Sequence, residues 1–335
     1  MPSLAHWFVA ISVILATGVQ ADSSYWQDSP QSDLESAKLA RTAPLPAEYR
    51  ILTVDLEQLT EKLDASARRG GTPVTIDLPH PEGGFSAFEM QPSEVMSPEL
   101  AVKFPEIRAY KGYSLGGTQA TVQLEITPRG LTAQVLSPGE RWMLDPASAG
   151  RPDLVLSYFA KSTESEGRQW QCQHESHDDS PLPSSLKDSL SRDGDSAQSR
   201  SIGQNLRTYR LAVAATGEYT KKFGTKADGM SAIVTTINRV KGIYEKEVGV
   251  SFTLIGNNDS IVYPDPLTDP FTGNNDARVL INESQAVIDD VIGVDDYDIG
   301  HTFSTGGGRG SGTRALYFKQ GKRYYRERRS TGRRV

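Results

Sequence analysis

A long helical pattern in the second half of the chain most constrains the fold. Its apolar residues recur at steps of three and four over five turns, which is typical of an amphipathic helix with one buried stripe. The residues of this stripe are Met230, Ile233, Ile237, Val240, Tyr244 and Val248. Gly249 follows where such a helix is expected to end. Alternating residues at 208–213 and the run 250–255 predict strands on either side of the helix.

Further elements continue the same rhythm. Residues 276–292 carry a second helical pattern, with Gly293 directly after it, and residues 297–303 read as a third strand. The order strand, helix, strand, helix, strand is typical of an α/β layer with crossover connections. Residues 204–308 therefore predict an α/β domain.

The first half of the chain has a different pattern. Short strand-like runs separated by Gly- and Pro-containing turns occupy residues 40–172, with one helical pattern at 56–67. In the run 121–126, Val122, Leu124 and Ile126 fall on one face, as a half-buried strand requires. We predict that residues 40–172 form an antiparallel, mostly β domain.

Two segments depart from the composition of a folded domain. Residues 173–203 are rich in Ser, Asp and Arg and poor in aromatic residues, so we predict a flexible linker with cleavage points at Arg192 and Arg200. Residues 309–335 hold ten Lys and Arg and one acidic residue, whereas the remainder of the chain holds 26 basic and 41 acidic residues. An acidic body thus carries a short basic tail.

The N-terminus predicts the location of the protein. Residues 7–17 form an apolar run too short to span a bilayer, and Val19 and Ala21 stand at the positions that a signal peptidase reads. We predict a signal peptide over residues 1–21 and a secreted protein, extracellular or periplasmic, with no membrane attachment after cleavage. The alternative is a single anchoring helix, for which the run is short.

Histidine and cysteine residues do not form a recognisable metal motif. His174, Glu175 and His177 resemble one, but the two histidines stand three positions apart, whereas a helical zinc site needs four. We interpret them as solvated linker residues. Cys172 is the only cysteine, which excludes a disulfide framework within the chain and any cysteine-rich metal scaffold. His301, on a predicted strand, is interpreted as a packed structural residue.

Glycine-rich stretches raise two further candidate sites. Residues 112–116 match the Gly-x-Ser-x-Gly pattern of serine hydrolases, but a strand pattern follows where that site needs a helix, so we predict a plain turn. Gly306, Gly307 and Gly308 follow a strand, as phosphate loops do, but lack the Gly-Lys-Ser/Thr ending. Aromatic residues interleave the basic tail, as in nucleic-acid binding; for a secreted protein we predict a solvated charge run and no nucleic-acid partner.

Three stretches together resemble a known family. Residues 211–219 resemble the opening strand of reprolysin-like zinc metallopeptidases of the metzincin group, and 237–245 resemble the helix that follows. Residues 297–308 are the most similar stretch. The preceding β-rich domain, through residues 95–100 and 105–107, resembles the propeptide-like region of secreted bacterial members. The resemblance implies a propeptide-like β domain followed by an incomplete α/β zincin-type domain.

The resemblance also implies an activity that this sequence does not fully support. Family members hydrolyse peptide bonds with a zinc ion, whose ligands lie in His-Glu-x-x-His-x-x-Gly-x-x-His. No histidine or methionine follows His301 here, so no catalytic or metal-binding residue carries over. We expect zinc for the family but none bound by this chain. The resemblance further implies that a protein or peptide substrate lies along the edge strand at Gly306, Gly307 and Gly308.

Two explanations of the missing element stay open. The chain leaves the family's reading frame near residues 308–309, or it is a natural shortened variant with a basic tail. In the first case the protein belongs to a secreted zinc metalloendopeptidase and is inactive as written. In the second it is a non-catalytic module that binds or inhibits a related protease, with Cys172 as a possible zinc-blocking ligand. A third reading is that the shortened α/β half does not fold stably.

Overall fold

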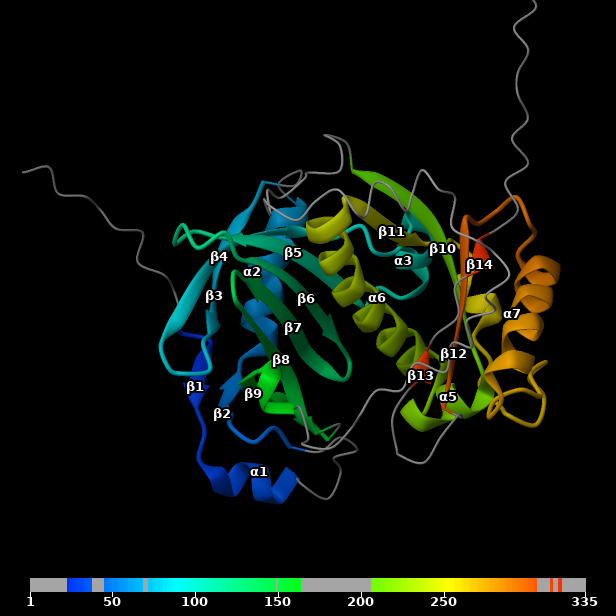
Figure 1. Ribbon diagram of the computed structural model, residues 1–335. Coiled ribbons are helices and arrows are strands. Elements are labelled where there is room, and N and C mark those ends of the chain that lie inside the picture. Colours follow the sequence, from blue (N-terminus) through cyan, green and yellow to red (C-terminus); the bar gives the residue numbers. More distant parts are fainter. Residues whose placement is uncertain are drawn as a thin grey trace, which may run out of the picture.

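The computed structural model of the chain has two sheets with one long helix between them (Figure 1). It describes residues 23–37, 45–68, 72–148, 150–163, 206–305, 314–315 and 319–320. The signal peptide and the linker predicted above lie outside these residues. No helix within the described ranges has the length and apolar character needed to cross a membrane.

The first half of the chain forms a nine-stranded antiparallel sheet, here called sheet A. Its spatial order is β1-β2-β9-β8-β7-β6-β5-β4-β3, so most neighbouring strands are also consecutive in the chain. The strands are β1 (Trp26–Asp28), β2 (Arg50–Val54), β3 (Val74–Pro79), β4 (Phe85–Pro92), β5 (Arg108–Ser114), β6 (Thr121–Thr127), β7 (Gly130–Ser137), β8 (Glu140–Ser148) and β9 (Arg151–Phe159). The short helices of this half are α1 (Gln31–Ala37), α3 (Pro98–Lys103) and the 3-10 turn η2 (Ala160–Thr163).

Sheet A curls around a single apolar core. Helix α2 (Leu56–Arg68) packs on its inner face through the fully buried Leu59 and Leu63. The two edges of the sheet approach each other, because the Trp26 Nε1 donates a hydrogen bond to the Asp77 carbonyl oxygen over 2.8 Å. We predicted that this domain begins at residue 40, but β1 and α1 precede that position and Trp26 belongs to the core.

The second half forms a smaller sheet, here called sheet B, in the predicted order. Strand β10 (Arg207–Ala215) lies between the parallel strands β11 (Val250–Leu254) and β12 (Ile299–Ser304). Two-residue strands, β13 (Arg314–Ala315) and β14 (Lys319–Gln320), pair antiparallel with β12. Helix α6 (Lys226–Val248) covers one face of sheet B and α7 (Ala277–Val291) the other, with α5 (Gly217–Phe223) and η3 (Asn258–Ile261) at the ends.

Local signals fix the limits of the long helix α6. Thr225 and Asp228 form a capping box, in which each side chain accepts from the other's backbone N–H. Gly249 ends the helix in the left-handed conformation with φ of 64°, which costs a glycine little. The helix therefore begins and ends close to where the sequence predicted.

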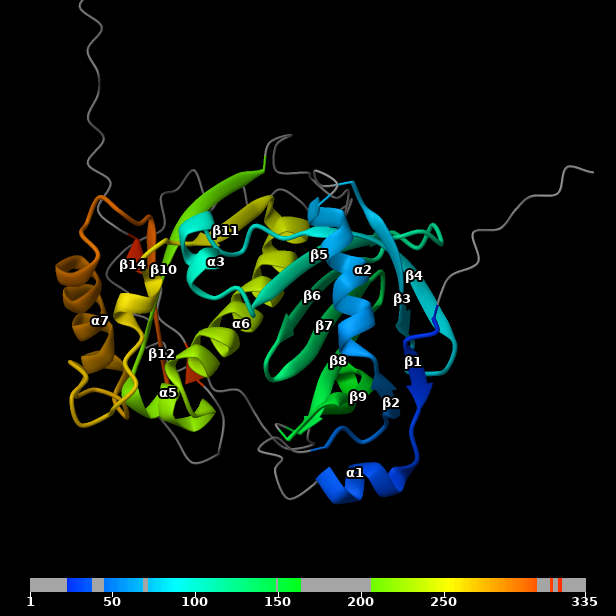
Figure 2. The same ribbon diagram turned by 180° about the vertical axis from the view of Figure 1, so that it is seen from behind.

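Helix α6 has a second packing partner that its apolar stripe does not predict. The helix contacts β6 and β7 of sheet A as well as sheet B, so it lies between the two sheets (Figure 1). Figure 2 shows α2 on the side of sheet A away from α6. Both faces of the central strands of sheet A are thus covered.

Candidate functional site

The carboxyl ends of the parallel strands form the first candidate site. In open α/β sheets this end is where ligands bind. Asn274 joins the segments that leave β10 and β12, because its Oδ1 accepts from Thr216 Oγ1 at 3.1 Å and from the Thr305 backbone N at 3.3 Å. Ser304 Oγ in turn donates to the Asn274 carbonyl oxygen at 2.9 Å. The loop that carries Asn274 therefore holds this end of sheet B together.

Gly217 permits the same loop to approach the start of α5. The Gly217 backbone N donates to Asp269 Oδ2 at 2.5 Å. A Cβ at Gly217 would lie 2.2 Å from the backbone nitrogen of Pro266. Only glycine fits this close approach. The site is thus built by packing of backbone against backbone.

His301 lies within β12 and is 6% exposed. Its ring packs edge-on against Phe303, with the ring centroids 4.9 Å apart. In the parallel register it stands opposite Val213 of β10. His301 is therefore a buried strand residue, as the sequence indicated.

The outer edge of β12 pairs antiparallel with two segments of the basic region. Phe303 pairs with Ala315, and Ile299 pairs with Gln320. The predicted substrate-binding residues Gly306, Gly307 and Gly308 lie outside the described residues, so their role stays a prediction. Among the described residues, the edge on which we expected a peptide is paired with the chain itself at both ends of β12.

The described residues do not fit a zinc ion. Within them, no group of three or more His, Cys, Asp and Glu side chains comes together. His80 lies in sheet A, edge-on to Trp142 and Phe159, far along the chain from His301. Cys172, His174 and His177 lie outside the described residues.

The Gly-x-Ser-x-Gly stretch is a turn between strands. Gly112 lies inside β5, and the next regular element is β6. A nucleophile elbow needs a strand followed by a helix. The prediction of a plain turn at residues 112–116 is confirmed.

Comparison with known families assigns the second half of the chain. Residues 205–326 match the metallo-peptidase family M12B, reprolysin-like. The chain contains a reprolysin-like M12B region. The match confirms the resemblance predicted from residues 211–219, 237–245 and 297–308. It continues to residue 326 and so includes part of the basic segment that we expected to lie outside the family likeness. No curated protein sequence matches the chain.

A second candidate site, which the sequence did not predict, lies between the reprolysin-like region and sheet A. Its first component is the segment 93–107, here called the crossover segment, which leaves sheet A after β4 and returns at β5. The Leu254 backbone N donates to the Val95 carbonyl oxygen at 2.8 Å, and the Ser97 N donates to the Leu254 carbonyl oxygen at 2.9 Å. The crossover segment thus adds to the β11 edge of sheet B.

Apolar residues of the crossover segment complete the core on the α6 face of sheet B. Val95 and Leu100 are fully buried there, and Ile107 is 4% exposed. Lys103 forms an ion pair with Asp259 at 2.7 Å on the outside. The N-terminal half therefore supplies part of the hydrophobic core of the reprolysin-like region.

The second component is the outer face of β6, β7 and β8, here called the interdomain face. Its members are polar side chains that point away from the core of sheet A and lie under helix α6: Gln123, Glu125, Thr132, Gln134 and Asp145. Glu125 accepts hydrogen bonds from Asn238 Nδ2 and, at 2.5 Å, from Thr132 Oγ1. Gln134 Nε2 donates to the Arg239 carbonyl oxygen at 3.1 Å.

An ion pair completes this polar contact. Arg239 Nη2 lies 2.5 Å from Asp145 Oδ1, and Tyr158 OH donates to the other oxygen of the same carboxylate. Glu125 is fully buried. Burial raises its pKa to about 7, and the Arg239 guanidinium limits the rise. A carboxyl group that titrates near neutral pH thus lies between the two halves of the molecule.

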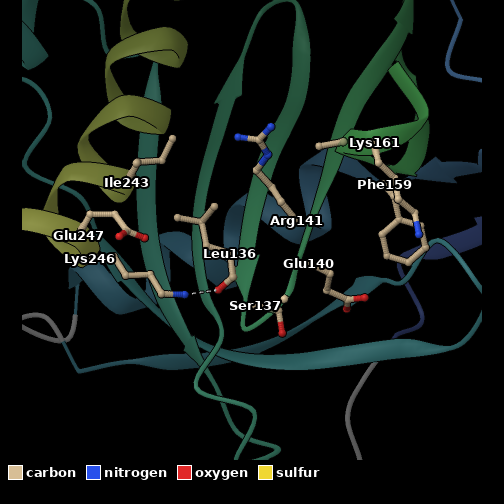
Figure 3. Close-up of a pocket in the computed structure, with 11 residues that line it drawn as sticks. Leu136, Ser137, Glu140, Arg141, Phe159, Lys161, Ile243, Lys246 and Glu247 are labelled. Carbon is tan, nitrogen blue, oxygen red and sulfur yellow. Dashed lines mark hydrogen bonds between the residues drawn. The ribbon is translucent and has the colours of Figure 1, made fainter. Parts of the chain in front are cut away.

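A cavity of 520 Å³ opens where this contact reaches the surface (Figure 3). The β7–β8 hairpin, η2 and the last turns of α6 line it. Lys246 Nζ donates to the Leu136 carbonyl oxygen at 3.0 Å and so joins helix to sheet at its rim. Both charge signs line the cavity, including Glu140, Arg141 and Glu247, so its lining selects no single ligand charge.

Proposed function

We propose that the chain derives from a secreted zinc metalloendopeptidase and that residues 26–163 are its propeptide-like domain. The observation that carries the proposal is the reprolysin-like match over residues 205–326 on a β10-α6-β11-α7-β12 layer. The predicted signal peptide and the propeptide-like resemblance of the first half support secretion as an inactive precursor.

We further propose that the 335-residue chain does not hydrolyse peptide bonds. Its five histidines include no His-Glu-x-x-His sequence. Without those ligands, no side chain here holds a metal ion that lowers the pKa of a bound water. The purified chain, supplied with zinc, is therefore expected to leave an unfolded protein substrate intact. Cleavage that a chelator abolishes would contradict this proposal.

Resequencing the gene across codons 304–312 and the region downstream tests the origin of the basic segment. A one-base change whose correction yields the histidine motif supports the reading-frame explanation. Reads that confirm the present codons support a natural variant instead.

A second candidate function follows from the interface. The first half of the chain buries Leu100 in the reprolysin-like core and covers α6 with the interdomain face. A chain that keeps these surfaces without catalysis is suited to bind or inhibit a related protease. Inhibition of such a protease by the purified chain, and its loss in a Leu100→Asp variant, would support this function. If inhibition occurs, a Cys172→Ser variant tests whether the thiol contributes.

A further inference from the structure

The interface between sheet A and helix α6 differs from an ordinary core. The face of β6 toward α2 carries Val122, Leu124 and Ile126, all in the apolar core. The face toward α6 carries Gln123 and Glu125, which are almost as deeply buried. Buried polar faces of this kind are typical of interfaces between separable units, because each face must also tolerate water.

Helix α6 meets the interdomain face at close range. Gly242 faces Gln123, and a Cβ at Gly242 would lie 2.5 Å from Gln123 Cγ. Asn238 of α6 donates to Glu125 and accepts from Ser93 Oγ at 2.9 Å. The contact is therefore specific, with hydrogen-bonding partners on both sides.

We propose that the interdomain face is a reversible docking surface for helix α6 and that the proton on Glu125 controls how tightly the two halves hold together. This proposal does not depend on whether the chain is a protease.

Charge balance explains the control. When Glu125 is protonated, Arg239 and Asp145 form a neutral buried pair. When Glu125 ionises, two carboxylates share one guanidinium in a site removed from water, and a buried uncompensated charge is costly. On separation Glu125 becomes solvated, and its pKa returns toward the ordinary value of 4.5.

Other charged groups face the same contact. Lys241 of α6 is buried and lies 3.9 Å from Glu245, an i,i+4 pair on the helix. Burial lowers the pKa of Lys241, and Lys111 of β5 and Glu94 stand nearby with opposite effects. These charges largely compensate one another, which leaves Glu125 as the group whose ionisation changes the balance near neutral pH.

The direction of the effect follows from the two pKa values of Glu125. The docked state binds the proton more tightly, so docking is strongest at acidic pH and weakens as the pH rises through about 7. Between pH 6 and pH 8 the equilibrium between docked and separated states is expected to shift about tenfold toward separation.

Two interdomain amides give a direct readout in the full chain. The backbone N–H groups of Ser97 and Leu254 bond only across the two halves, so they exchange with solvent when the halves separate. Hydrogen exchange, expressed as protection factors, is measured at pH 6 and pH 8. The wild-type protection of both amides is expected to fall about tenfold, whereas amides between β6 and β7 are expected to keep theirs.

Matched variants assign the effect to one carboxyl group. Glu125→Gln keeps both hydrogen-bonding positions without a charge, and its protection is expected not to depend on pH. Glu89→Gln removes an exposed carboxylate on β4 and is expected to behave as wild type. Thr132→Val removes a donor to the ionised carboxylate and is expected to move the transition to higher pH. Wild-type protection without pH dependence, or a dependence that persists in Glu125→Gln, would overturn the proposal.

Discussion

Replacing Leu100 by alanine tests whether the crossover segment belongs to the core of the reprolysin-like region. Leu100 lies in α3, within the first half of the chain, and none of its side chain is exposed. It packs in the cluster that includes Met230 and Ile237 of α6. Removing a fully buried leucine side chain loses its transfer free energy and leaves a cavity, which together cost about 2–5 kcal/mol.

Val102 provides the matched control. It lies two residues away on the same helix but is 80% exposed. A Val102→Ala variant is expected to change the free energy of unfolding by less than about 0.5 kcal/mol. Both changes shorten an aliphatic side chain, so the difference between them reports burial.

Urea unfolding of the full chain measures both variants. Circular dichroism follows the helices, and the fluorescence of the buried Trp26 and Trp142 follows the core of sheet A. Leu100→Ala is expected to lower the helical transition midpoint clearly below that of Val102→Ala. Equal midpoints in the two variants would refute the assignment of Leu100 to the core.

Two further substitutions test the end of sheet B. Asn258 is fully buried and bonds both the backbone N and the carbonyl oxygen of Val213, so Asn258→Ala is expected to cost about 2–3 kcal/mol in urea unfolding. The exposed Asn257→Ala is expected to cost less than about 0.5 kcal/mol, and similar losses would contradict the role of Asn258. Gly217→Ala places a Cβ against the backbone of the neighbouring loop and is expected to lower the melting temperature by several degrees, whereas Gly150→Ala meets no atom within 4 Å. Unchanged melting of Gly217→Ala would show that the loop is free to move.

Periodicity predicted the elements of the second half because they are amphipathic with simple caps. The apolar stripe of α6 and Gly249 are both local in the sequence, and they fixed the helix to within a few residues. The strands flanking it were equally clear from alternation. The family resemblance depended on these same stretches, and the match over 205–326 confirmed it.

The interdomain site escaped prediction because its residues carry no local pattern. Glu125 and Gln134 stand at the polar positions of alternating strands, where solvent is the simplest expectation. Their burial depends on a helix more than a hundred residues later in the chain. The signal that was present is Asn238, a polar residue next to the apolar stripe of α6, and its meaning appears only beside Glu125.

The amino-acid sequence by itself determined the secondary structure, the α/β order of the second half and its family, since hydrophobic period and capping act over neighbouring residues. Only the tertiary structure decided that the crossover segment completes the second core and that Glu125 is buried between the two halves. The physical reason is that burial, and with it the pKa of a carboxyl group, depends on which distant surface covers the residue.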